Sequence, residues 1–415
     1  MQRRNFLRHL LATPIAATTL MYGNQLRLAQ AATRGKTLVV IFQRGGCDGL
    51  NTIVPYGDPN YYALRGTTIA VPSPATDPRA AIDLNGFFGL HPSLAPLYDI
   101  YRKEHLAILP AVHFEGATRS HFVNQDSIES GFTNRLSDGW LNRHLVAEPK
   151  EGSIRAISFG SGVAHALRGS AQVSVIKDLS QIGLGAPGSH ENDLRAYLRE
   201  VYNQSINPVD ANRFLVYKNG NVLLDNLDIL GGINPSTYLP ANGAVYPETG
   251  YGKQLRQAAQ LIKEDIGLEV VTISIGGWDH HNNQGGAEVN GKQSLLHEDF
   301  SQGIKALYTD LGNLMKEVLI LTMTEFGRTA AVNGSLGTDH GYASAWMVIG
   351  HNVKGDIYGT WPGLRTDQLH DGRFLEKNFD YRDVLGEILV KHLGDSNLNE
   401  VLPDYTNYHP IGFLS

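Results

Sequence analysis

The pattern of apolar and polar positions along the chain predicts an α/β protein. Five apolar runs rich in branched side chains predict buried strands at 37–43, 106–112, 270–275, 318–323 and 345–349. Continuous apolar runs are typical of strands that are covered on both faces. Helical spacing of apolar residues is clearest at 254–266, and further helices are predicted at 94–101, 194–201, 300–315 and 381–392. We therefore expect a mostly parallel central sheet with helices on both faces.

Two segments interrupt this alternation. Residues 55–92 are rich in Pro, Gly, Asp and Tyr and show little periodicity, and residues 148–248 are Gly- and Ser-rich with mixed signals. The length of the chain allows one large domain with insertions. We expect a single α/β hydrolase-like domain at 32–415, with irregular insertions at about 55–92 and about 148–248.

The first 31 residues have the order of a signal peptide. Arg3-Arg4 is a twin-arginine pattern, a modestly apolar run follows, and Ala29-Gln30-Ala31 offers a cleavage site before Ala32. We expect export of the folded protein by the twin-arginine machinery to the periplasm or beyond. The alternative is an N-terminal membrane anchor, but the apolar stretch is shorter than the roughly 20 residues that span a bilayer, so we expect no stable membrane span.

Charge and cysteine content exclude several classes of function. Removal of residues 1–31 takes away four arginines and no acidic residue, which moves the formal net charge from −6 to −10. We therefore expect no nucleic-acid partner. Cys47 is the single cysteine, which excludes an internal disulfide and a thiolate metal cluster.

Polar residues suited to a metal site follow the predicted strands. They are Asp48, Ser120, Asp279, His281 and Glu325, and His340 stands just ahead of the predicted strand at 345–349. Taken singly, Asp48 is typical of a turn, Ser120 of a helix N-cap and His340 of a structural histidine. Together they predict a shared metal site, because parallel strands end at one sheet edge and carboxylate oxygens and imidazole nitrogens bind zinc and similar ions.

Five motifs carry a resemblance to a known family. They are Arg44–Thr52, Thr118–Phe122, Gly276–His281, Thr324–Arg328 and Gly337–Gly341. From about residue 1 to residue 393 the chain resembles the exported bacterial family catalogued as domain of unknown function 1501. That family is similar, more distantly, to the alkaline phosphatase and sulfatase superfamily. Members of that superfamily bind one or two metals, often zinc, at the C-terminal edge of a parallel sheet and cleave phosphate or sulfate esters.

The resemblance implies roles for individual residues. Asp48 matches the carboxylate after the first strand that helps to bind one metal, and Ser120 matches the nucleophile at a helix start. The other metal would be bound by Asp279, His281 and His340. Glu325 stands at the aspartate of an Asp-His pair, but Phe326 stands at its histidine, so the second site would lose a ligand. The expected cofactor is a divalent metal, with zinc preferred, as one or two ions.

These residues predict an exported, metal-dependent hydrolase of phosphate or sulfate esters with Ser120 as its nucleophile. Its substrate would be a small-molecule or glycan ester. Arg119, Asn124 and Arg328 are candidates for binding the non-bridging oxygens, although each could instead have a surface or supporting role. The alternative is a catalytically inactive exported binding protein that keeps the same fold, as Phe326 allows.

Overall fold

The computed structural model describes residues 35–74, 77, 79–150, 152, 154–186, 190–204 and 211–415. The predicted signal peptide at 1–31 lies outside the described residues. Within the described part of the chain, we find no helix with the length and apolar character needed to cross a membrane.

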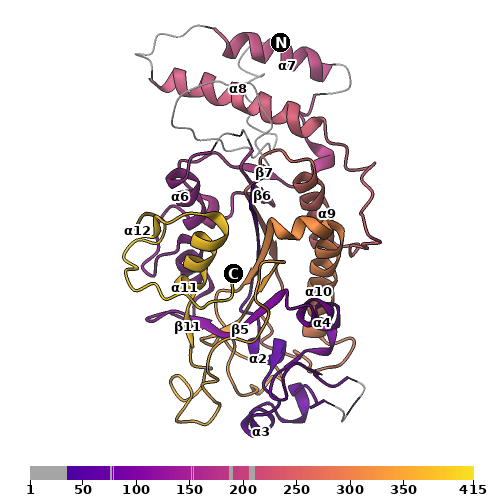
Figure 1. Ribbon diagram of the computed structural model, residues 1–415, viewed down its shortest axis with the longest axis vertical. Coiled ribbons are helices and arrows are strands. Elements are labelled where there is room, and N and C mark those ends of the chain that lie inside the picture. Colours follow the sequence, from indigo (N-terminus) through magenta and orange to yellow (C-terminus); the bar gives the residue numbers. More distant parts are fainter. Residues whose placement is uncertain are drawn as a thin grey trace.

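An eight-stranded sheet forms the centre of the molecule, in the order β11-β5-β10-β9-β1-β8-β6-β7 (Figure 1). Its strands are β1 (Thr37–Gln43), β5 (Leu106–His113), β6 (Ala156–Phe159), β7 (Ser174–Ile176), β8 (Val270–Ile275), β9 (Val318–Met323), β10 (Ser344–Ile349) and β11 (Phe379–Asp380). β1 pairs in parallel with β8 and β9, whereas β10 is antiparallel to β9 and β5. The prediction of a mostly parallel sheet is confirmed, and all five predicted strands are present.

Helices cover both faces of this sheet because the strand side chains alternate between two cores. Leu38, Val40 and Phe42 of β1 belong to one buried cluster, and Val39 and Ile41 belong to the other. α6 (Trp140–Ala147), α11 (Tyr381–Glu387) and α12 (Leu398–Val401) lie on the first face. α4 (Ala95–Arg102), α9 (Gly250–Lys263) and α10 (Lys292–Leu311) lie on the second. α10 begins earlier than predicted because its first turn buries the polar residues Gln293 and Ser294.

The two segments predicted to be irregular contain more regular structure than their patterns indicate. Residues 55–92 include α3 (Pro59–Ile69), and a small second sheet has the order β2-β4-β3, with β2 (Ile53–Val54), β3 (Ile82–Asp83) and β4 (Gly89–Leu90). Residues 148–248 supply β6, β7 and α8 (Ala211–Gly231), besides α7 (His190–Tyr202), which contains the predicted helix at 194–201. α7 and α8 lie together at one end of the molecule (Figure 1), joined by ion pairs between Arg195 and Asp228 and between Arg199 and Asp225. Helices that bury little apolar surface leave a weak periodic signal in the sequence.

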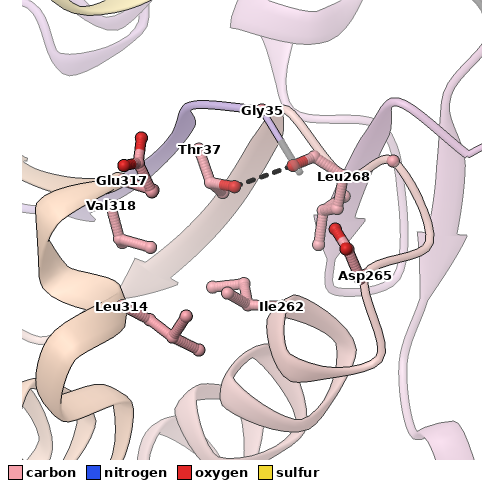
Figure 2. Close-up of a pocket in the computed structure, with 9 residues that line it drawn as sticks. Gly35, Thr37, Ile262, Asp265, Leu268, Leu314, Glu317 and Val318 are labelled. Carbon is pink, nitrogen blue, oxygen red and sulfur yellow. Dashed lines mark hydrogen bonds between the residues drawn. The ribbon is translucent and has the colours of Figure 1, made fainter. Parts of the chain in front are cut away.

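A small cavity lies at the amino end of β1, away from the edge that carries the predicted site (Figure 2). Thr37 donates a hydrogen bond of 2.8 Å to the backbone oxygen of Leu268 in its wall. The cavity measures about 20 Å³, which is room for a single water. It is therefore too small for a ligand site.

A buried charge cluster joins three segments near this amino edge. His144 of α6 bonds through Nδ1 to Asp395 at 2.7 Å and through Nε2 to Glu269 at 3.1 Å. Burial alone would lower the pKa of His144, but the hydrogen bonds to Asp395 and Glu269 raise it. Burial would raise the pKa of Glu269, but His144, Arg155 and Lys150 lower it to about 2. The cluster therefore stabilises the fold in its charged form.

This cluster predicts two limits to stability in pH. Folding lowers the pKa of Glu269 from its unfolded value of about 4.3 to about 2. Its contribution to the stability of the fold is therefore fully present above a pH of about 4.3 and is lost as the pH falls towards about 2. Folding raises the pKa of His144 above its unfolded value of about 6.5. Its contribution to the stability of the fold is therefore fully present below a pH of about 6.5 and is lost as the pH rises through the folded pKa. Denaturant unfolding across pH should show both losses, and His144→Gln should lower the free energy of unfolding between them by about 3 to 5 kcal/mol. The exposed His190 of α7 provides the control, and equal effects of His144→Gln and His190→Gln would contradict the prediction.

Candidate metal centre

The loops at the carboxyl ends of the central strands meet at one edge of the sheet. Asp279 and His281 follow β8, Glu325 follows β9, and His340 precedes the antiparallel strand β10. α5 (His121–Ser130) begins after the loop that leaves β5. The parallel order of β1, β8 and β9 thus brings together residues that are far apart in the sequence.

Three predicted metal ligands meet in a compact triangle. Nε2 of His281 lies 3.0 Å from Oδ1 of Asp279 and 3.0 Å from Nε2 of His340, and His340 Nε2 lies 3.2 Å from the same carboxylate oxygen. Ligand atoms that share a tetrahedral zinc ion lie about 3.3 Å apart, given metal-to-ligand distances of about 2.0 to 2.1 Å. The triangle therefore has the dimensions of one face of a tetrahedral site.

Hydrogen bonds at the far side of each ring orient the two imidazoles. Nδ1 of His340 lies 2.8 Å from the backbone oxygen of Arg119, which can only accept, so Nδ1 carries the proton. Nδ1 of His281 lies 2.9 Å from Oδ1 of Asp339. In the neutral rings both Nε2 lone pairs face the triangle, and either a proton or a metal cation between them removes their repulsion. A carboxylate or carbonyl on the second nitrogen is also how metal-binding histidines are held.

Asp279 keeps its negative charge at this edge. Burial alone would raise its pKa, but Arg328 and the imidazoles of His281 and His121 lower it. Nη1 of Arg328 donates to Oδ1 of Asp279 at 2.7 Å. Burial lowers the pKa of His340, which favours the neutral ring that a metal requires.

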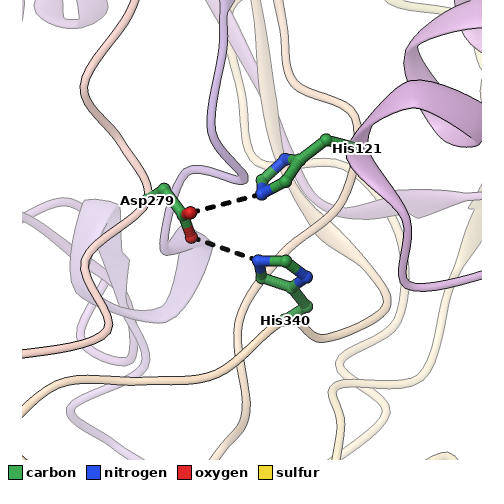
Figure 3. A group of neighbouring side chains, drawn as sticks. All are labelled: His121, Asp279 and His340. Atoms are coloured by element: carbon green, nitrogen blue, oxygen red, sulfur yellow. Dashed lines mark hydrogen bonds and ion pairs between the residues drawn. The ribbon is translucent and has the colours of Figure 1, made fainter.

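A third imidazole, which the sequence interpretation missed as a ligand, also faces Asp279 (Figure 3). Nε2 of His121 lies 3.4 Å from Oδ2 of Asp279. The ligand atoms of His121, Asp279 and His340 lie within 4.8 Å of one another. The sequence held one signal for this third imidazole: His121 directly follows Ser120 in the motif Thr118–Phe122.

Glu325 lies behind His121. Its side chain is fully buried, and its Oε1 accepts hydrogen bonds from Nδ1 of His121 at 2.7 Å, Nε2 of Gln125 at 2.8 Å and the amide of Gly45 at 2.9 Å. The hydrogen bond to Glu325 raises the pKa of His121. In this arrangement Glu325 orients an imidazole, and its predicted role as a direct metal ligand stays a prediction.

Asp48 does not lie in the cluster of convergent ligand atoms. Both of its oxygens pair with the guanidinium of Arg65, Oδ1 at 2.9 Å from Nη2 and Oδ2 with Nη1. Gln284 also donates to Oδ2 at 2.6 Å, and Asp48 and Arg65 are both buried. Its predicted role as a metal ligand stays a prediction, and the Arg65 charge already neutralises this carboxylate.

The predicted catalytic and anion-binding residues have different surroundings. Ser120 is the N-cap residue of α5, and its hydroxyl makes no capping hydrogen bond. Arg119, whose backbone oxygen bonds to His340, has an exposed side chain, and its guanidinium lies 3.8 Å from the carboxylate of Asp371. Asn124 is buried, and its amide bonds to Thr118. Arg328 is directed at Asp279, so Arg119 is the exposed cation among the three predicted anion-binding residues.

A larger cavity of about 180 Å³ adjoins the triangle. Asp339, the partner of His281, and Asn333 form part of its wall, with Leu64 of α3 and Arg373 on other sides. Asn333 also donates to the backbone oxygen of His281 at 2.9 Å. Two residues of the cavity wall, Asn333 and Asp339, thus also form hydrogen bonds to His281.

One part of the chain is similar to a known protein family. Residues 238–397 match the family described as "Protein of unknown function (DUF1501)". The predicted resemblance to this family is confirmed over these residues, whereas the prediction placed it from about residue 1 to residue 393. The match includes the motifs around Asp279, Glu325 and His340, and those around Asp48 and Ser120 precede it. No curated protein matches the chain.

Solved structures with the predicted distant resemblance are also found, at low similarity. Alkaline phosphatase PafA is 10% identical with a TM-score of 0.33, and the alignment covers 72% of this chain and 64% of that one, slightly under two thirds. The soluble domain of lipooligosaccharide phosphoethanolamine transferase A from Neisseria meningitidis is 12% identical, with a TM-score of 0.32 and coverages of 81% and 82%. The PsFucS1 sulfatase from Pseudoalteromonas sp. is 10% identical, with a TM-score of 0.34 and coverages of 78% and 64%.

Proposed function

We propose that this chain is an exported, metal-dependent hydrolase of phosphate or sulfate esters with Ser120 as its nucleophile. The observation that carries the proposal is the triangle of Asp279, His281 and His340, whose ligand atoms lie 3.0 to 3.2 Å apart. Export and a periplasmic or secreted location remain part of the proposal, because residues 1–31 lie outside the described residues.

The residues of the triangle fit a first-row divalent cation such as zinc. Two imidazole nitrogens and one carboxylate oxygen are a donor set of this class, and hydrogen bonds from Nδ1 to Asp339 and to Arg119 hold both rings. When bound, such a cation polarises an ester oxygen as a Lewis acid.

The start of α5 supplies the other groups that ester cleavage needs. Ser120 stands at the helix N-terminus, where unpaired backbone N–H groups favour an incoming phosphate or sulfate. Its hydroxyl is not used in capping and is available for attack on the ester. The exposed guanidinium of Arg119 is suited to hold non-bridging oxygens in a bidentate grip.

The cavity beside Asp339 is a candidate site for the organic part of the ester. Its volume of about 180 Å³ and its mixed wall suit a small polar group. Arg373 supplies hydrogen-bond donors, and Leu64 supplies an apolar surface. Leu64 lies in the 55–92 segment, which thus contributes to this candidate site.

An exported binding protein without turnover is the second candidate. The ion pair of Asp48 with Arg65 and the burial of Phe326 favour it, because neither Asp48 nor Phe326 then supports a second metal. A protein with one metal and no second ion can retain ligand binding while it lacks hydrolysis.

Metal analysis of the purified mature protein, with assays on phosphate monoesters, phosphate diesters and sulfate esters, separates these candidates. We expect about one first-row metal ion per chain and hydrolysis of one ester class that stops after chelation and returns with Zn²⁺. Stoichiometric metal with no hydrolysis across the panel would favour the binding protein. Metal far below stoichiometry, even after incubation with Zn²⁺, would overturn the metal-dependent hydrolase.

A further inference from the structure

His121 has one ring nitrogen whose role the triangle leaves open. Its Nε2 is buried and makes no hydrogen bond to the described residues, although Oδ2 of Asp279 lies 3.4 Å away. Its Nδ1 is held by Glu325 at 2.7 Å. A buried polar atom with no hydrogen bond calls for an explanation such as an ion.

We propose that His121 is a fourth protein ligand of the cation bound by Asp279, His281 and His340. This inference rests on the metal site of the proposed function and extends its ligand set to three imidazoles and one carboxylate. Such a set selects a first-row transition ion or zinc over Mg²⁺ and Ca²⁺, which prefer oxygen ligands.

The geometry around His121 matches that of the other two imidazoles. In all three rings Nδ1 faces an acceptor, which is Glu325 for His121, Asp339 for His281 and the backbone oxygen of Arg119 for His340. Each Nε2 then faces the carboxylate of Asp279, at 3.0 to 3.4 Å. Figure 3 shows His121 and His340 directed at Asp279 from different segments of the chain.

Phe326 holds this arrangement from one side. Its ring centroid lies 4.8 Å from that of His121 and 4.9 Å from that of His340, and the side chain is fully buried. A phenylalanine that contacts two of the imidazoles limits their rotation and keeps the ligands preorganised. Phe326 thus supports the proposed four-ligand site although it binds no metal.

The competing explanation is a charged His121 ring that pairs with carboxylates on both sides. The two explanations predict opposite results on removal of the ring. A ligand contributes to affinity, so its loss weakens metal binding. A positively charged ring beside Asp279 repels the incoming cation, so its loss leaves the affinity unchanged or raises it.

Isothermal titration of the metal-free mature protein with Zn²⁺ and Co²⁺ tests the inference. Loss of an outer hydrogen-bond partner costs about 10- to 100-fold in affinity, so we expect His121→Ala to weaken binding by about 100-fold or more. His121→Gln, which keeps polar groups at this position, should show the same loss. The visible spectrum of bound Co²⁺ should also change in both variants, because the coordination changes.

Controls separate this inference from the proposed function. His190→Ala removes an exposed imidazole of α7 and should bind Zn²⁺ like the unaltered protein. Circular dichroism of the metal-free variants checks their fold. An affinity of His121→Ala equal to or above that of the unaltered protein, with an unchanged Co²⁺ spectrum, would overturn the role of His121. Absence of Zn²⁺ binding in the unaltered protein would overturn the metal site itself, and Mg²⁺ binding as tight as that of Zn²⁺ would overturn the assigned class of cation.

Discussion

Asp279→Asn is expected to lower Zn²⁺ affinity by at least about 100-fold and to remove ester hydrolysis with it, because loss of a mere outer partner already costs about 10- to 100-fold. Asp279 is the one carboxylate to which His121, His281 and His340 all point. Asparagine keeps an oxygen that accepts from Arg328 and removes only the negative charge. Titration calorimetry and the ester assay measure the two effects.

Asp371→Asn is the matched control for Asp279→Asn. Asp371 is an exposed carboxylate, 3.8 Å from Arg119, and lies outside the group of convergent ligand atoms. Its substitution should leave Zn²⁺ affinity unchanged. If Asp279→Asn binds Zn²⁺ as tightly as Asp371→Asn, the triangle is not a metal site.

Ser120→Ala is expected to lower kcat by about 10⁴-fold or more, because loss of a nucleophile removes the covalent step. The Ser120 hydroxyl makes no capping hydrogen bond, so the free energy of unfolding should change by less than about 0.5 kcal/mol. Zn²⁺ affinity should also stay unchanged. Steady-state kinetics on the ester that the unaltered protein cleaves, together with denaturant unfolding, distinguish a catalytic role from a structural one.

Two further substitutions sharpen the test of Ser120. Ser120→Thr keeps a hydroxyl at the start of α5 and should retain part of the activity. Ser335→Ala removes an exposed hydroxyl from the loop between β9 and β10 and should have no effect. A fully active Ser120→Ala protein would assign the nucleophile to another group and leave the metal site in place.

The strands and their shared edge were readable from local pattern. β1, β8 and β9 have the bounds that their apolar runs predicted, because a strand buried on both faces leaves a continuous apolar signal. The carboxyl ends of parallel strands lie at one edge, so Asp279, His281 and Glu325 could be grouped before their distances were known. His340 reaches the same edge because the strand that follows it, β10, is antiparallel to β9. Register places them there, and their residue types then indicate a metal.

The tertiary contacts of the predicted site residues could not be predicted from the sequence. Asp48 pairs with Arg65, which belongs to α3 in a segment without clear periodicity, so the ion pair depends on how that helix folds back onto the loop that follows β1. Sequence distance carries no signal for such a contact. Only the packed structure shows that this carboxylate already has a cation.

Tertiary structure also determines which of two adjacent residues at the start of α5, Ser120 or His121, faces Asp279. Successive residues of a helix point about 100° apart, so Ser120 and His121 cannot both face Asp279 in the same way. Glu325 and Phe326 hold the His121 ring towards Asp279. The sequence by itself determined the strands of the sheet, because these follow from local periodicity, and its motifs indicated three candidate ligands through the family resemblance. The tertiary structure decided that His121 faces Asp279 beside them and that Asp48 pairs with Arg65, because helix docking and ion pairing depend on residues distant in the chain.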